Sequence, residues 1–181
     1  MKILNLPNIL TLSRIIIIPV ICVIYYFGFI GWNYVAAALF LIASLTDLFD
    51  GKIARKRNQV TNFGKFIDPM ADKMLVIASL LIIQEWRSIP AFVNIIIISR
   101  ELLISGFRLI AAQQGVVIAA DRTGKWKTAV QMTAIVILFL DNLLFNLMGI
   151  PMGEILLYLS VILSVWSCAE YIIKNANILK E

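Results

Sequence analysis

The chain has 181 residues, of which 61% are apolar and 15% charged, and its mean hydropathy is +0.90. A soluble domain averages about half apolar and about a quarter charged residues, so this composition excludes one or two water-soluble domains, and it excludes intrinsic disorder as well. The sequence contains no histidine, which excludes Ser-His and Cys-His catalysis and the usual zinc sites. The net charge of +5 favours an anionic membrane surface or anionic substrates over nucleic acid.

Long apolar stretches recur along the chain and predict an all-α integral membrane protein with six transmembrane helices. A spanning helix needs roughly 20 mainly apolar residues, and six segments qualify: about 11–28, 32–51, 66–84, 90–112, 126–147 and 151–174. Residues 2–10 place apolar side chains among polar neighbours, with Pro7 near the middle, and predict a short interfacial segment before the first span. Since no internal repeat or long linker interrupts the chain, we expect a single domain over residues 1–181.

Lysine and arginine are distributed unevenly between the two sides that six spans define. Both termini and the loops around 52–65 and 113–125 fall on one side. That side, with the helix ends facing it, holds all of the 16 basic residues except Arg87. Because the side richer in lysine and arginine is cytoplasmic, we expect a multi-pass protein of the cell membrane with both termini in the cytoplasm.

Four aspartates lie at helical spacing around the connection between the second and third spans. Asp47 and Asp50 are three residues apart, and Asp68 and Asp72 are four apart, so each pair shares a helix face. Because the connection is short, we expect neighbouring helices whose aspartates line a polar cavity at the cytoplasmic side. Four carboxylates this close repel one another strongly unless a cation binds them. Oxygen ligands alone favour Mg²⁺, Mn²⁺ or Ca²⁺ over zinc or copper.

Two other interpretations of these aspartates stay open at this point. In the first, each aspartate pairs with a nearby lysine or arginine at the level of the lipid headgroups. In the second, the four form a cation pathway in a small transporter. Their position at one end of the helices, and the lack of a matching pattern in the other half of the chain, disfavour a transporter.

The residues between the two aspartate pairs complete a longer motif. They include two glycines and an alanine, which let a ligand approach the backbone, and an arginine, which neutralises phosphate oxygens. The whole pattern resembles, at every position, the signature of the CDP-alcohol phosphotransferase family: Asp47-x2-Asp50-Gly51-x2-Ala54-Arg55-x8-Gly64-x3-Asp68-x3-Asp72.

This resemblance implies a six-helix membrane enzyme, generally a homodimer. Such an enzyme cleaves a CDP-activated lipid at its diphosphate, passes the phosphatidyl group to an alcohol and releases CMP. The resemblance also implies that Asp72 is the general base that takes the proton of the acceptor hydroxyl. The implied ligand sites are two divalent ions, Mg²⁺ or Mn²⁺, on Asp47, Asp50, Asp68 and Asp72, and the CDP-lipid on Gly51, Ala54, Arg55 and Gly64.

Basic residues in the fourth and fifth spans bear on the identity of the acceptor alcohol. SRELLISGFRL contains Arg100 and Arg108, and GKWKTAVQ contains Lys125 and Lys127. Near a phosphate-transfer site, such a cluster favours a phosphorylated acceptor. Alternatively, Arg100 pairs with a carboxylate of the helical bundle, although the adjacent Glu101 is expected on a different helix face. The two lysines would then be ordinary residues of the cytoplasmic side that reach toward the headgroups.

Three further stretches resemble one bacterial branch of the family, whose acceptor is glycerol 3-phosphate. They are NLPNILTLSR near the start, SRE at 99–101, and GKWKT together with Gln131. The resemblance runs over nearly the whole chain and implies CDP-diacylglycerol and glycerol 3-phosphate as substrates, with membrane lipids around the protein. Inositol phosphate, serine or phosphatidylglycerol stay open as other acceptors. Arg14, in the first stretch, either touches phosphate or anchors its helix at the membrane interface.

Overall fold

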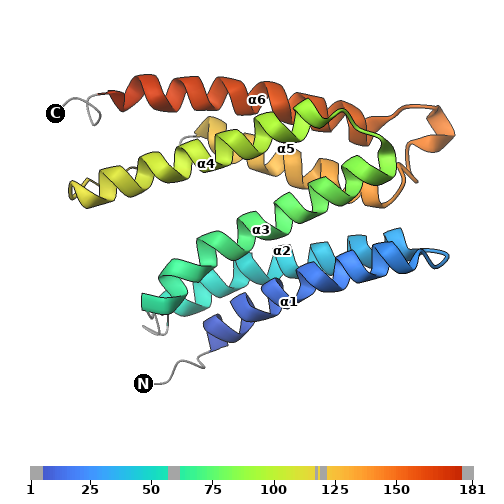
Figure 1. Ribbon diagram of the computed structural model, residues 1–181, viewed down its shortest axis with the longest axis horizontal. Coiled ribbons are helices and arrows are strands. Elements are labelled where there is room, and N and C mark those ends of the chain that lie inside the picture. Colours follow the sequence, from blue (N-terminus) through green and yellow to red (C-terminus); the bar gives the residue numbers. More distant parts are fainter. Residues whose placement is uncertain (1–5, 57–61, 117, 119–121, 177–181) are drawn as a thin grey trace. The chain divides into compact units, whose positions relative to one another are not determined.

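The computed structural model describes residues 6–56, 62–116, 118 and 122–176, with side chains for 9–46, 67, 68, 70–116, 118 and 122–176 (Figure 1). The helices are α1 Leu6–Phe27, α2 Trp32–Lys56, α3 Asn62–Arg87, α4 Ala91–Gln113, α5 Arg122–Phe139 and α6 Met152–Lys174, with a short 3-10 helix η1 at Asn146–Met148. These ranges contain no β-strand. The predicted all-α fold with six long helices is therefore confirmed.

Glycine ends the first helix. Gly28 and Gly31 have φ values of 59° and 84°, in the left-handed region that glycine enters without a steric penalty from a Cβ atom. The N–H of Gly28 donates to the carbonyl oxygens of Ile24 and Tyr25, at 3.3 and 3.1 Å, and so satisfies groups at the end of α1. This tight turn brings α2 back along α1.

The beginning of the chain differs from the prediction of a separate interfacial segment. Residues 6–10 form the first turns of α1, and Pro7 falls where its missing N–H removes no hydrogen bond of the helix. Residues 2–5 lie outside the described residues.

The fifth helix ends at Phe139, whereas the predicted span continues to residue 147. Asp141 and Asn142 have φ values of 56° and 53°, and this left-handed backbone breaks the helix. Asn142 is held there by its side chain, whose Oδ1 accepts from the Gly153 N–H at 2.7 Å and whose Nδ2 donates to Glu154 Oε2 at 2.9 Å. The break thus depends on contacts with the start of α6.

The described residues divide into two units. The first contains α1, α2, α3 and Phe139–Asp141, and the second contains α4, α6 and α5 up to Leu138. In the first unit, α1 packs along both α2 and α3, while the described parts of α2 and α3 touch each other much less. In the second unit, α4 packs along α6, where small buried side chains allow close approach of the helices. Those side chains are Ser160, Ser164 and Ser167.

Residues 139–141 are the part of the first unit that comes from late in the sequence. The carbonyl oxygen of Phe139 accepts from Asn33 Nδ2 at 3.0 Å, and its ring meets Trp32 and Phe40 at centroid distances of 6.4 and 6.5 Å. Asp141 forms an ion pair with Arg87 at 2.7 Å. These contacts lie toward the end of α3, far along the helix from Asp68.

The helices carry the apolar surface of a membrane protein. The segments Ile9–Phe27 and Met152–Lys174 are long and apolar enough to cross a membrane, and Trp32–Thr46 is a shorter apolar segment. Large apolar side chains are exposed on these helices and on α3 and α4, as is typical of a protein surrounded by lipid. Examples on α1, α2, α3, α4 and α6 are Ile16, Ile42, Leu81, Ile95 and Ile162.

Candidate active site

Two side chains of α1 hold Asp68 of α3. Thr11 Oγ1 donates a hydrogen bond to Asp68 Oδ1, and Arg14 Nη2 lies 3.8 Å from the same oxygen. Thr11 and Arg14 are 2% and 1% exposed, whereas the Asp68 side chain is 45% exposed. Within the described part of the chain, both contacts fall on Oδ1. The contacts from α1 therefore orient the carboxylate and leave Oδ2 for another ligand.

Asp72 lies one turn after Asp68 and is partly buried. Positions four apart share a helix face, so the two carboxylates lie on one side of α3. Ala71 and Leu75, beside them on the helix, are buried in the core of the unit. The aspartates therefore border a well-packed surface that restricts the movement of α3.

The other motif residues lie next to this site along the chain. The last turns of α2 contain Asp47, Asp50, Gly51, Ala54 and Arg55. The structure does not describe the side chains of these residues. Gly64 belongs to the first turn of α3. Because α2 ends at Lys56 and α3 begins at Asn62, the short connection keeps these two helix ends close in space.

The donor atoms of the motif fit a divalent cation that prefers oxygen. Carboxylates are the side chains that bind Mg²⁺ and Mn²⁺ most readily, and Asp68 has one oxygen to offer. Among residues with described side chains, no three acidic, cysteine or histidine groups come close enough to hold a metal ion. Of the four aspartates in the motif, Asp68 and Asp72 have described side chains, whereas Asp47 and Asp50 do not.

Glu101 of α4 is the centre of an ionic cluster in the second unit. Its Oε1 accepts from Lys127 Nζ at 2.5 Å and from Arg100 Nη1 at 3.0 Å. Arg100 Nη2 also donates to Ser167 Oγ of α6 at 3.1 Å. The side chains of Lys127, Arg100 and Glu101 are 2%, 12% and 18% exposed. Four polar side chains from three apolar helices thus meet out of solvent, which is typical of a functional site in a membrane protein.

The expectation that Glu101 points away from Arg100 is wrong. Adjacent helix positions do not face each other, but the arginine side chain is long enough to bend around the helix and reach the carboxylate at 3.0 Å. The structure therefore agrees with the alternative in which Arg100 pairs with a carboxylate.

The start of α5 completes the surroundings of this cluster. A Cβ atom on Gly124 would lie 3.2 Å from Arg100 Nη2, so the backbone of α5 comes close to the guanidinium. Gln131, one turn after Lys127, is buried, and its Oε1 has no hydrogen-bond donor in the described part of the chain. The same face of α5 thus presents an ammonium group and an amide oxygen.

Arg108 and Lys125 lie apart from the contacts around Glu101. Arg108 Nε donates to the Tyr171 hydroxyl at 3.2 Å, and its guanidinium carbon lies 5.6 Å from the centre of that ring. Lys125 is exposed and makes no hydrogen bond or ion pair with residues that the structure describes. The four basic residues expected at the acceptor site are thus divided into two that share Glu101, one on Tyr171 and one at the surface.

Four side chains of these clusters are not among the predicted site residues, namely Thr11, Glu101, Ser167 and Tyr171. Polar groups in apolar helices were the available signal, since such groups are costly in a membrane and seek partners. Their partners, however, are 57 residues away for Thr11 and 67 for Ser167, and no local pattern identifies them.

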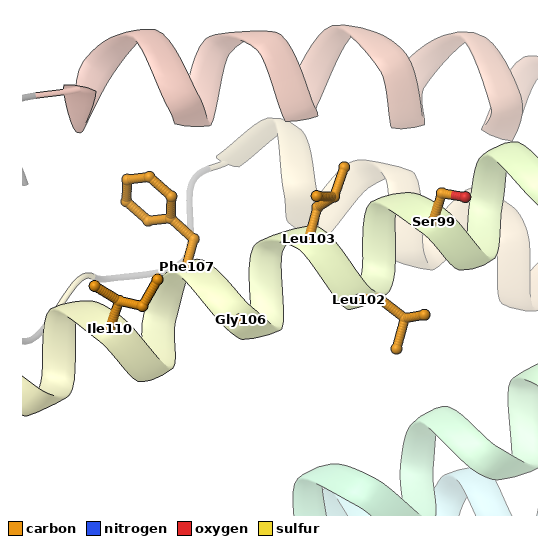
Figure 2. A pocket seen from close by; sticks show the side chains of 6 residues that line it. All are labelled: Ser99, Leu102, Leu103, Gly106, Phe107 and Ile110. Carbon is orange, nitrogen blue, oxygen red and sulfur yellow. The ribbon is translucent and has the colours of Figure 1, made fainter. Parts of the chain in front are cut away.

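A pocket of about 690 Å³ runs along α4, and Figure 2 labels the six residues that line it. They are Ser99, Leu102, Leu103, Gly106, Phe107 and Ile110. Ser99 supplies the only polar side chain of this lining, so the pocket fits hydrocarbon and not phosphate. The apolar lining of this pocket differs from the charged cluster around Glu101.

Known proteins resemble this chain over nearly its whole length. A family model described as CDP-alcohol phosphatidyltransferase matches residues 4–166. Three similar bacterial proteins are each named CDP-diacylglycerol–glycerol-3-phosphate 3-phosphatidyltransferase. The protein of Bacillus subtilis is 44% identical over 97% of this chain and 97% of its own. The protein of Haemophilus influenzae is 42% identical over 93% of this chain and 91% of its own. The protein of Rickettsia typhi is 40% identical over 92% of this chain and 94% of its own.

Proposed function

Since the chain belongs to the CDP-alcohol phosphatidyltransferase family, we propose that it transfers the phosphatidyl group of CDP-diacylglycerol to glycerol 3-phosphate. The products are phosphatidylglycerophosphate and CMP. One observation carries this proposal: the likeness to the Bacillus subtilis enzyme covers 97% of both chains. The complete aspartate motif lies inside the residues that match the family.

We propose that Asp47, Asp50, Asp68 and Asp72 hold two divalent ions, Mg²⁺ or Mn²⁺. Such ions, when bound, neutralise the diphosphate and stabilise the leaving CMP. The contacts of Asp68 support this role, because Thr11 and Arg14 occupy one carboxylate oxygen and fix the direction of the other. Outer residues that orient a ligand in this way are a regular part of metal sites.

Asp72 is the proposed general base. It takes the proton of the acceptor hydroxyl as the hydroxyl oxygen forms a bond to the phosphorus that carries diacylglycerol. The bond between that phosphorus and the bridging oxygen breaks, and CMP leaves with the electron pair. The position of Asp72 one turn from Asp68, on a helix anchored by its buried neighbours, supports this role.

The two substrates bind different residues of the chain in this proposal. Gly51, Ala54, Arg55 and Gly64, at the facing ends of α2 and α3, bind the CDP group of the lipid. Arg100 and Lys127 bind the phosphate of glycerol 3-phosphate, with Arg108 and Lys125 as outer contributors. The support is their burial: two cations held by one carboxylate retain one positive charge inside apolar helices, where an anionic ligand is favoured.

We further propose that all six helices cross the cell membrane in a single domain, residues 1–181, that acts as a homodimer. The aspartates and both termini lie on the cytoplasmic side in this arrangement, because that side carries nearly all of the lysine and arginine. The two longest apolar segments, Ile9–Phe27 and Met152–Lys174, support the first and last of these spans.

The test is a transfer assay with the purified protein in detergent, CDP-diacylglycerol, labelled glycerol 3-phosphate and Mg²⁺ or Mn²⁺. We expect CMP release together with lipid-soluble label. Absence of both would contradict the proposal. Transfer only to inositol phosphate, serine or phosphatidylglycerol would agree with the chemistry of the family but contradict glycerol 3-phosphate as the acceptor.

A further inference from the structure

Glu101 is the residue through which two helices share one charge cluster. A single oxygen, Oε1, accepts from Arg100 of α4 and from Lys127 of α5, at 3.0 and 2.5 Å. The two nitrogens therefore lie at most about 5.5 Å apart. At this spacing one phosphate group contacts both donors, because its oxygens accept hydrogen bonds in several directions.

The position of Lys127 relative to Arg100 depends on this contact. The close helix pairing in the second unit is between α4 and α6, and α5 makes no comparably close pairing among the described helices. Arg100 is fixed on its own side by Ser167 of α6. The bond from Lys127 to Glu101 thus ties α5 to this framework at the level of the two cations.

The charge on Glu101 has two opposing effects on an anionic ligand. It lowers the positive potential of the cluster, and it prevents two nearly buried cations from repelling each other apart. Alignment is the larger effect in a site built for one phosphate group, because small displacements of a binding group cost about 10²-fold in rate.

We infer that Glu101 is a positioning residue of the acceptor site, whose carboxylate holds Arg100 and Lys127 at the spacing that binds the phosphate of glycerol 3-phosphate. This inference rests on the proposed function. It assigns to Glu101 no contact with the substrate and no part in proton transfer.

The experiment compares Glu101→Gln with Glu101→Asp and with a matched control, Glu154→Gln. Glu154, at the start of α6, is also a partly buried glutamate of the second unit, and its carboxylate accepts a hydrogen bond from Asn142 Nδ2. For each protein, the KM for glycerol 3-phosphate, the KM for CDP-diacylglycerol, kcat and the midpoint of thermal unfolding are measured. Protection against thermal unfolding by glycerol 3-phosphate gives a reading that does not depend on turnover.

We expect Glu101→Gln to raise the KM for glycerol 3-phosphate by about tenfold or more and to lose the protection by that ligand. The KM for CDP-diacylglycerol should stay near that of the wild type. The unfolding midpoint should fall, because two nearly buried cations lose the carboxylate between them. Glu101→Asp keeps the charge on a shorter side chain and should show a smaller increase. Glu154→Gln should resemble the wild type.

An unchanged or lower KM for glycerol 3-phosphate in Glu101→Gln overturns the inference, as does an equal rise in both KM values. If Glu101→Gln does not fold, the aspartate variant decides, and wild-type kinetics in that variant also overturn the inference. Failure of both variants to fold would assign the carboxylate to stability instead. A wild-type protein that does not use glycerol 3-phosphate refutes the proposed function itself, which separates the two failures.

Discussion

Asp68 and Glu101 are both carboxylates that meet buried basic residues on apolar helices, and they differ in how fully those residues engage them. Asp68 is 45% exposed, and its basic neighbour Arg14 stands 3.8 Å away. Glu101 is 18% exposed and has two cations at 2.5 and 3.0 Å. A carboxylate with weak internal pairing retains affinity for an added cation, whereas one that is fully paired mainly organises its partners. The first unit thus offers negative charge to a ligand, and the second offers positive charge.

The largest effect should come from the aspartate pair on α3. Asp72→Asn removes the proposed base without changing size, and we expect kcat to fall about a thousandfold, within the range that general bases supply. CMP release under saturating substrates measures this loss. Asp141→Asn is the matched control, because Asp141 pairs with Arg87 at the far end of α3, and it should retain activity. Comparable activity in the two variants would contradict the role of Asp72.

A smaller loss should follow removal of a cation from the second unit. Lys127→Gln leaves Glu101 and Arg100 in place but removes the buried ammonium group, and we expect kcat/KM for glycerol 3-phosphate to fall about a hundredfold. Lys125→Gln, two positions away and exposed, should lower it only about twofold, because exposed charges are screened by solvent. An equal fall in kcat/KM for the two variants would show that the burial of Lys127 does not determine how much a lysine contributes to the use of glycerol 3-phosphate.

The smallest effect should come from the hydroxyl that orients Asp68. Thr11→Val removes the hydrogen bond to Oδ1, and we expect the Mg²⁺ or Mn²⁺ concentration for half-maximal activity to rise about tenfold, as for other outer residues of metal sites.

The concentration of metal that protects the protein from thermal unfolding should rise in parallel. Thr133→Val serves as the control for the substitution, because Thr133 is exposed and its hydroxyl donates to the Ala129 carbonyl oxygen of its own helix. Unchanged metal dependence in Thr11→Val would mean that Asp68 does not need the contact from α1.

The helices and the aspartate motif were predictable because both depend on local spacing. Apolar stretches of spanning length identified all six helices, and the i, i+4 rule placed Asp68 and Asp72 on one face of α3. The end of α5 was not predictable, because residues 140–147 remain largely apolar and the break depends on Asn142 meeting Gly153 and Glu154. The partner of Thr11 was not predictable either, since nothing near residue 11 indicates a carboxylate on another helix.

Phe139 and Asp141 have a consequence for the order in which the chain matures. Ribosomes deliver α1, α2 and α3 first, yet Trp32, Phe40 and Arg87 meet partners that are made some fifty residues after α3 ends. The three helices of the first unit, two of which carry the aspartates, therefore reach their full set of contacts only after the fifth helix has been synthesised. A fragment that stops at Arg87 would carry the whole aspartate motif, but Trp32 and Phe40 would lack Phe139, and Arg87 would lack Asp141. We therefore expect that the first unit cannot be separated from the rest of the chain at Arg87 without loss of these contacts.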